Sequence, residues 1–192
     1  ILSVITWAPF VSALLIMFAF RHRPLAVRWT AVIGTGISLV LSIWLYAAYD
    51  RQTAGFQFQE MLPLVPSLGI SYELAVDGMS LLMMLLTAII IFAGSFASWT
   101  IKTRSQEFYA LLLLLVTGVF GVFASLDLFM LFLCYEIAVL PMYLLIAIWG
   151  WQVTREYAAM KLTLYLFIGS VVALVGGFLY FGNPQNTSFP PP

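Results

Sequence analysis

One apolar stretch, residues 127–150, constrains the fold more than any other part of the sequence. It is long enough to cross a bilayer as a helix, because a span needs about 20 mostly apolar residues. Yet it contains Glu136 near its middle and Pro141 five residues later. A carboxylate at that depth is costly unless it is paired, solvated or protonated, and the proline leaves the carbonyl of Ile137 without its helical partner. We interpret this pair of costly features as part of a proton path.

The composition predicts an all-α integral membrane protein. The chain is 63% apolar and only 8% charged, far outside the range of soluble domains, so the lipid bilayer must be its main solvent. The formal net charge of zero argues against nucleic acid as a partner. The single cysteine, Cys134, lies within an apolar run, which leaves neither a disulfide framework nor a zinc site. Residues 1–20 lack the basic start and cleavage site of a signal peptide, so we expect a spanning helix there.

Six transmembrane spans are expected, at about residues 2–20, 27–49, 78–100, 107–125, 127–150 and 158–181. We expect them to form a single transmembrane domain over residues 1–192. Basic residues collect in alternate connections, at Arg21, Arg23, Arg28, Lys102, Arg104 and Arg155, whereas the other side carries only Arg51. Because Lys and Arg in short loops mark the cytoplasmic side, both termini should lie outside and the basic connections inside.

The connection 50–77 is the only long one, and we expect it outside the cytoplasm. Alternation in residues 56–59 favours a short strand or hairpin there. Asp77 precedes the third predicted span and Asp127 begins the fifth, and at such a position an aspartate can cap the free backbone amides of the first turn. The fourth and fifth spans follow each other almost at once, so they should be antiparallel neighbours, and Gly118 and Gly121 would permit close packing.

Two charged residues are candidates for proton transfer. Glu136 follows Asp127 by nine residues, about 13–14 Å along a helix, which places it near the bilayer midplane. Burial and neighbouring charges tune the proton affinity of such a group; the alternative is a structural ion pair or a permanently protonated clamp between helices. Lys161 lies about one turn into the last span. It could act in proton transfer through water, Thr163 or Tyr165, or it could extend its stem to the interface and serve only as an anchor.

Several blocks of sequence resemble the antiporter-like chain M of respiratory complex I, the counterpart of mitochondrial chain 4. They are Tyr135-Glu136, Leu140-Pro-Met-Tyr143, Ala147-Ile-Trp-Gly150 and Arg155-Glu-Tyr-Ala-Ala-Met-Lys161, with Asp77-Gly-Met-Ser80 and Leu126-Asp-Leu-Phe129 also matching. The resemblance covers most of residues 70–177, and the first spans fit only in character.

The resemblance implies roles for both candidate residues. In that family the glutamate that matches Glu136 forms a buried pair with a lysine of the seventh helix. The lysine that matches Lys161 lies on the sixth helix near the proton input. Such chains have about fourteen helices in two inverted repeats with broken helices, an arrangement typical of transporters. This sequence stops after a sixth span, so we expect it to be the N-terminal part of such a bundle, without the seventh-helix lysine.

The expected function is proton translocation, as a non-redox membrane-arm subunit of NADH:quinone oxidoreductase in the bacterial inner membrane. Its partners would be other membrane-arm subunits. NADH, FMN, Fe–S clusters and quinone would bind to other subunits, with no cofactor or metal on this chain. Two alternatives stay open: a subunit of a multi-subunit cation/proton antiporter, and a scaffold subunit in which Glu136 only clamps helices together.

Overall fold

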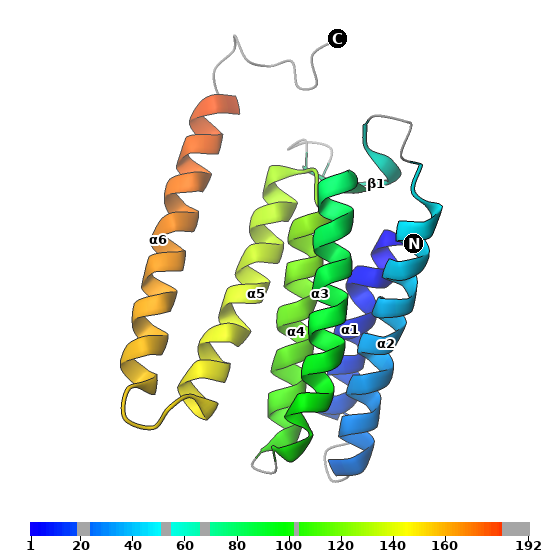
Figure 1. The fold of residues 1–192 in the computed structure, drawn as a ribbon. Helices are drawn as coiled ribbons and strands as arrows, with labels where there is room; N and C mark the ends of the chain where they lie inside the picture. The colour runs from blue at the N-terminus through cyan, green and yellow to red at the C-terminus, as the bar shows by residue number, and fades with distance from the viewer. Residues whose placement is uncertain (19–23, 51–54, 66–69, 102–103, 182–192) are drawn as a thin grey trace. The chain divides into compact units, whose positions relative to one another are not determined.

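The computed structural model describes residues 1–18, 24–50, 55–65, 70–101 and 104–181. The chain forms two compact units, Ile1–Leu145 and Ile146–Pro192. Figure 1 labels the helices of both units. Four of the residues on which the predicted orientation rests lie outside the described ranges: Arg21, Arg23, Arg51 and Lys102. The expected orientation and the expected single domain therefore stay predictions.

The described ranges contain six α-helices, which confirms the predicted all-α membrane fold. They are α1 (Leu2–Phe18), α2 (Pro24–Ala48), α3 (Gly78–Ala97), α4 (Ser105–Ala124), α5 (Leu128–Trp149) and α6 (Arg155–Phe181). A 3-10 turn, Ser98–Thr100, continues α3. Five of the helices are long and apolar enough to cross a membrane, and α1 is a shorter apolar helix of 17 residues. Compared with the predicted spans, α4 begins two residues earlier, and α2 and α6 each begin three residues earlier.

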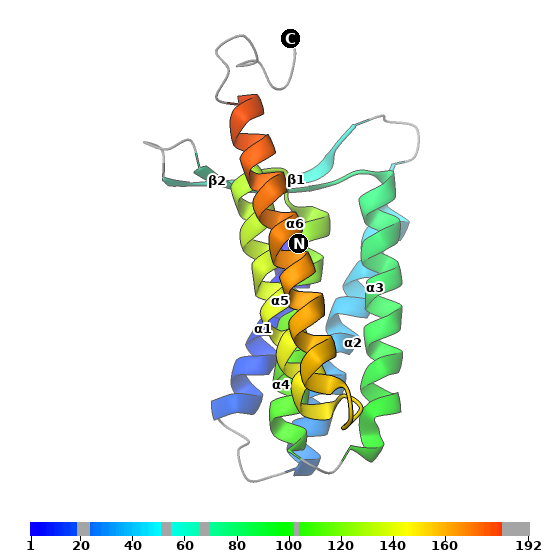
Figure 2. The same ribbon diagram turned by 90° about the vertical axis from the view of Figure 1, so that its left-hand side faces the viewer.

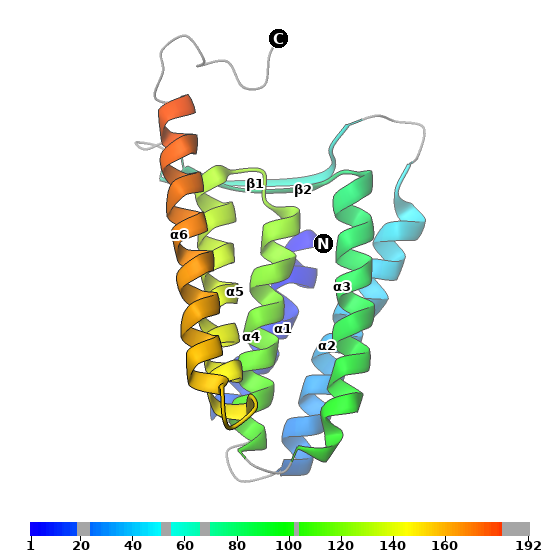
Figure 3. The same ribbon diagram turned by 60° about the vertical axis from the view of Figure 1, so that its left-hand side comes forward.

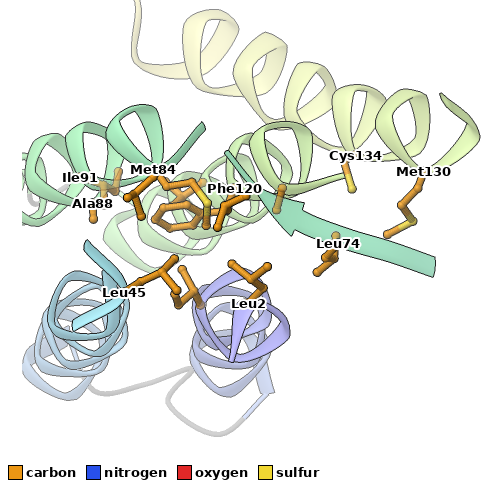
Figure 4. Close-up of a cluster of buried hydrophobic side chains, with 14 of the residues drawn as sticks. Leu2, Leu45, Leu74, Met84, Ala88, Ile91, Phe120, Met130 and Cys134 are labelled. Carbon is orange, nitrogen blue, oxygen red and sulfur yellow. The ribbon is translucent and has the colours of Figure 1, made fainter. Parts of the chain in front are cut away.

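Helices α1 to α4 pack into one bundle in the first unit. Helix α1 contacts α2 and α4, while α2 contacts α3, which also reaches α4. The helices α2 and α3 run side by side in opposite directions (Figure 2). The bundle has a continuous apolar core, to which α1 contributes Leu2, α2 Leu45, α3 Met84 and α4 Phe120 (Figure 4). A second apolar cluster, around Ile16, Tyr109 and Leu113, lies at the end of the bundle where α1 ends and α4 begins.

A two-stranded hairpin lies across the end of this bundle where α3 begins and α4 ends (Figure 3). Its antiparallel strands are β1 (Gln57–Val65) and β2 (Ile70–Val76), with Met61 opposite Glu73. The hairpin predicted from the alternating residues is therefore present, and it is longer than the alternation indicated. Leu74 of β2 is fully buried in the same core as the helices (Figure 4), so the hairpin is packed onto the bundle.

Candidate proton-transfer site

Helix α5, which carries Glu136, begins at a capped end. The Asp127 carboxylate accepts a hydrogen bond from the backbone N–H of Phe129 at 2.9 Å, and the Asp127 carbonyl accepts one from Leu131 at 2.9 Å. The first bond satisfies a backbone N–H of the first turn that has no partner within the helix, and the second is the first bond of the helix itself. The predicted capping role of Asp127 is confirmed.

The same aspartate also ties α5 to the hairpin, which the sequence did not predict. The second carboxylate oxygen of Asp127 accepts a hydrogen bond from the backbone N–H of Ser71 at 2.9 Å. Beside it, the backbone N–H of Leu126 donates to the carbonyl of Glu73 at 3.0 Å, and Ser125 pairs with Leu74 as a β-bridge. The start of α5 thus continues the edge of β2. This contact joins residues 56 positions apart, and local sequence patterns carry no signal for it.

Two glycines of α4 fix one face of α5 against the bundle. A Cβ atom on Gly118 would lie 2.6 Å from the backbone nitrogen of Ala138 and from the carbonyl oxygen of Cys134. A Cβ atom on Gly121 would lie 2.4 Å from the Cys134 sulfur. Only glycine permits so close an approach, which confirms that the two helices are neighbours and that these small residues are packing positions.

Glu136 lies on the other side of α5 from this contact. At 100° per residue, Glu136 is turned by about 200° from Cys134, whereas Pro141 falls within about 20° of it. In agreement, Cys134 and Pro141 are buried, and Glu136 is half-buried. The helix continues through Pro141 as far as Trp149. The carboxylate therefore lies on the face of α5 that is turned away from α4.

Lys161 lies in the second unit, whereas Glu136 belongs to the first. The Lys161 ammonium is 5.6 Å from the ring centroid of Tyr157, one turn nearer the start of α6. The side chain is exposed, and its stem extends toward the beginning of the helix, as an interfacial anchor would. In the same unit, the Arg155 guanidinium donates to the carbonyl of Ile148 at 3.3 Å and so links α6 to the end of α5.

Comparison with known proteins shows which family this chain is similar to. A family model described as "NADH:quinone oxidoreductase/Mrp antiporter, TM" matches residues 125–191. The chain is 38% identical to NAD(P)H-quinone oxidoreductase chain 4 2 of Thermosynechococcus vestitus, over 92% of this chain and 33% of that protein. It is 36% identical to NADH-quinone oxidoreductase subunit M of Rhodobacter capsulatus, over 91% and 34% respectively. The resemblance to the chain M family is confirmed.

Similarity to this family extends beyond residues 70–177. A chain 4 protein of Nostoc is 37% identical over 98% of this chain, so the first spans also match. In solved structures, the fold matches a chain of respiratory complex I from Thermus thermophilus, with a TM-score of 0.78, 25% identity and coverage of 96% of this chain and 37% of that one. A chain of an archaeal membrane-bound sulfane sulfur reductase shares the fold alone, with a TM-score of 0.81 at 19% identity, over 97% of this chain and 28% of that one. The chain spans about a third of the length of the curated relatives it matches.

Proposed function

We propose that this chain is a proton-translocating membrane-arm subunit of an NADH:quinone oxidoreductase. The observation that carries the proposal is Glu136: an acidic residue, half-buried halfway along an apolar membrane-length helix. It falls inside the 125–191 segment that matches the family model. Ionisable residues inside a membrane are costly and usually functional.

In this proposal Glu136 is the proton carrier. Its carboxylate takes up a proton when the surrounding charge favours the neutral form and releases it when a nearby cation favours the charged form. A charge displacement arriving along the membrane arm from the quinone site would alternate these two conditions. The coupling is thus a free energy shared between two distant sites, and no electron passes through this chain.

The contacts that hold α5 in place support the role of Glu136 as a proton carrier. The hairpin fixes the start of the helix through Asp127, and Gly118 holds its inner face against α4. A proton carrier needs a defined distance to its partners, because the interaction between charges falls with separation. Fixing one face of α5 against α4 places Glu136 on the opposite face of the helix.

Lys161 is proposed as a second proton-transfer residue at the start of α6. A lysine ammonium is a compact charge whose proton affinity changes readily with its surroundings. Its place over Tyr157 fits an interfacial position from which a proton could enter. Lys161→Met, which removes the ammonium, should then lower proton uptake. If Lys161 is only an anchor, Lys161→Arg should leave proton uptake unchanged.

The proposed setting follows from the same relatives. We place the chain in the bacterial inner membrane among other membrane-arm subunits. NADH, FMN, the Fe–S clusters and quinone would be held elsewhere in the complex. Proteins named as chain 4 or subunit M of quinone oxidoreductases match nearly the whole chain, which supports this assignment.

A second candidate function is transport in a cation/proton antiporter complex. The description of the matching family model itself names both oxidoreductase and Mrp antiporter proteins. The same helix-borne glutamate would serve there, but ion gradients would replace quinone reduction as the driving force.

One experiment separates the two functions. Inside-out membrane vesicles containing the complete complex are energised with NADH, and proton uptake is followed with and without a quinone-site inhibitor. We expect the inhibitor to abolish uptake, because translocation depends on quinone reduction. A sodium or potassium gradient is then imposed without NADH as the matched condition. Proton uptake that follows the cation gradient and ignores the inhibitor would contradict the oxidoreductase assignment and support the antiporter.

A further inference from the structure

We propose that the end of the first unit where α2 begins and α3 ends binds the headgroup of an anionic phospholipid, through Arg28 and the rings of Trp29 and Trp99. The site is separate from the proposed proton path on α5. It lies at the opposite end of the bundle from the hairpin (Figure 3).

An aromatic platform forms this surface. Trp99 stacks on Phe96, with ring centroids 6.2 Å apart and an interplanar angle of 10°. Trp29 meets Trp99 edge-on at 5.8 Å, and Phe92 extends the row beside Phe96 at 5.1 Å. Trp29 and Phe96 are 55% and 47% exposed. Tryptophan rings favour the headgroup level of a bilayer, so this platform marks where headgroups meet the chain.

The guanidinium of Arg28 lies 5.6 Å from the centroid of the Trp99 ring. One of its nitrogens donates to the carbonyl of Ile101 at 3.2 Å. An arginine has five N–H donors, and the described residues accept no further bond from this one. Its Nε is buried without a partner among them. Buried donors normally have an acceptor, so the site is missing one.

No carboxylate of the described residues forms a salt bridge with Arg28. Arg104, the other arginine described at this end of the bundle, differs in this respect, because it pairs with Glu107 at 2.7 Å. Among the described residues at this end, two arginines, Arg28 and Arg104, stand against one carboxylate, Glu107. The positive charge of these residues exceeds the negative charge, and the phosphate of a lipid would balance it.

The chemistry of the ligand follows from these features. A guanidinium binds phosphate oxygens through paired hydrogen bonds, and basic residues at the membrane surface attract anionic lipids. A lipid also places its glycerol and first methylenes beside the exposed rings of Trp29 and Phe96, which a free phosphate cannot do. The fit is thus to an anionic phospholipid such as phosphatidylglycerol.

The test uses the protein purified together with its accompanying subunits. It is washed with mixed micelles of detergent and phosphatidylcholine and titrated with phosphatidylglycerol, and bound lipid is counted by extraction and mass spectrometry. We expect Arg28→Gln to weaken the retention of phosphatidylglycerol about tenfold. Arg104→Gln, which removes an arginine already paired, should retain as much as the wild type. Arg28→Lys should fall between them, because a lysine lacks the planar fork.

If Arg28→Gln does not assemble, Trp29→Leu gives the same test at an exposed position, with a smaller loss expected. If Arg28→Gln and Trp29→Leu retain as much phosphatidylglycerol as the wild type, the proposal is overturned. Equal losses in Arg28→Gln and Arg104→Gln would also overturn it, because only the general charge of the surface would then matter. Displacement of the lipid by millimolar inorganic phosphate would show a site for phosphate instead of lipid. Cross-linking of Arg28 to an acidic residue of another subunit would show a protein contact instead.

Discussion

At the scale of single residues, three carboxylates hold helix ends in the same way. Asp77 accepts a hydrogen bond from the backbone N–H of Ser80 at 2.7 Å, and Asp127 caps α5. Glu60 reaches from β1 to the first turn of α1 and accepts bonds from the N–H groups of Leu2 at 3.0 Å and Ser3 at 3.1 Å. The first two caps follow from local sequence. The third does not, because Glu60 is distant in sequence from the helix it caps.

The Asp77 cap predicts a measurable loss of stability. Asp77→Ala removes the acceptor for Ser80 and should lower the free energy of unfolding by about 1 kcal/mol. Asp77→Asn keeps an acceptor oxygen and should lose less. Denaturant unfolding of the purified protein in detergent, followed by loss of helical circular dichroism, measures both. Equal stability of the alanine variant and the wild type would contradict the capping role.

The same cap predicts a pH dependence. The hydrogen bond from Ser80 holds the pKa of Asp77 below its usual range. For Glu60, burial raises the pKa, but the hydrogen bonds that its carboxylate accepts at the start of α1 outweigh this effect and leave the pKa lowered. Because the folded pKa values are lowered, this stabilisation is complete above the unfolded values of about 4 and is lost as pH falls through the folded ones. Asp77→Asn should therefore flatten part of the loss of stability below about pH 4, and an unchanged acid profile would contradict this.

At the scale of elements, the molecule depends on how α5 is fixed. The residues that form α5 could be predicted from hydropathy, because a long apolar segment has few alternatives to a helix in lipid. The small residues Gly118 and Gly121 indicated which face of α4 would pack closely. The contact of Ser71 with Asp127 was not predictable, since it depends on where the hairpin lies in three dimensions. Likewise, no sequence pattern indicated that Arg28 would lie over Trp99.

Because α4 approaches α5 so closely, an added methyl group should destabilise the protein at Gly118 of α4 but not at Gly94 of α3. Gly118→Ala places a carbon 2.6 Å from the backbone of α5, and overpacking of this kind costs about 1–3 kcal/mol. Gly94→Ala is the matched control in α3, where an added Cβ meets nothing within 4 Å. Thermal unfolding in detergent should show a lower midpoint for the first variant only. Equal midpoints would contradict the packing.

The link between hairpin and helix predicts a local effect at Asp127. Asp127→Ala removes the acceptor of both Ser71 and Phe129, whose N–H groups should then exchange with deuterium faster. Loss of the cap alone costs about 1 kcal/mol, so protection of Phe129 should fall about fivefold. Asp77→Ala serves as the control, because it should expose Ser80 and leave Ser71 protected. Unchanged exchange at Ser71 in Asp127→Ala would contradict the link.

At the scale of the whole molecule, the orientation in the membrane is open to direct test. A cysteine placed at the exposed Gln59 of the hairpin should react with an impermeant maleimide added outside intact cells. One placed at Arg104, which is 61% exposed, should react only after permeabilisation. The native Cys134 is 5% exposed and should give a low background. Labelling in the opposite order would reverse the predicted topology.

The central claim concerns Glu136, and Glu136→Gln in the complete complex tests it most directly. The amide keeps the shape of the side chain and removes its titratable proton, while Glu107→Gln at the exposed start of α4 controls for loss of a carboxylate. Electron transfer and proton uptake are measured in the same vesicles, after assembly is checked on native gels. We expect both activities of the assembled Glu136→Gln complex to fall together by at least about tenfold, with Glu107→Gln near wild type. If both activities persist at the wild-type level, Glu136 is a structural feature of α5 and does not carry protons.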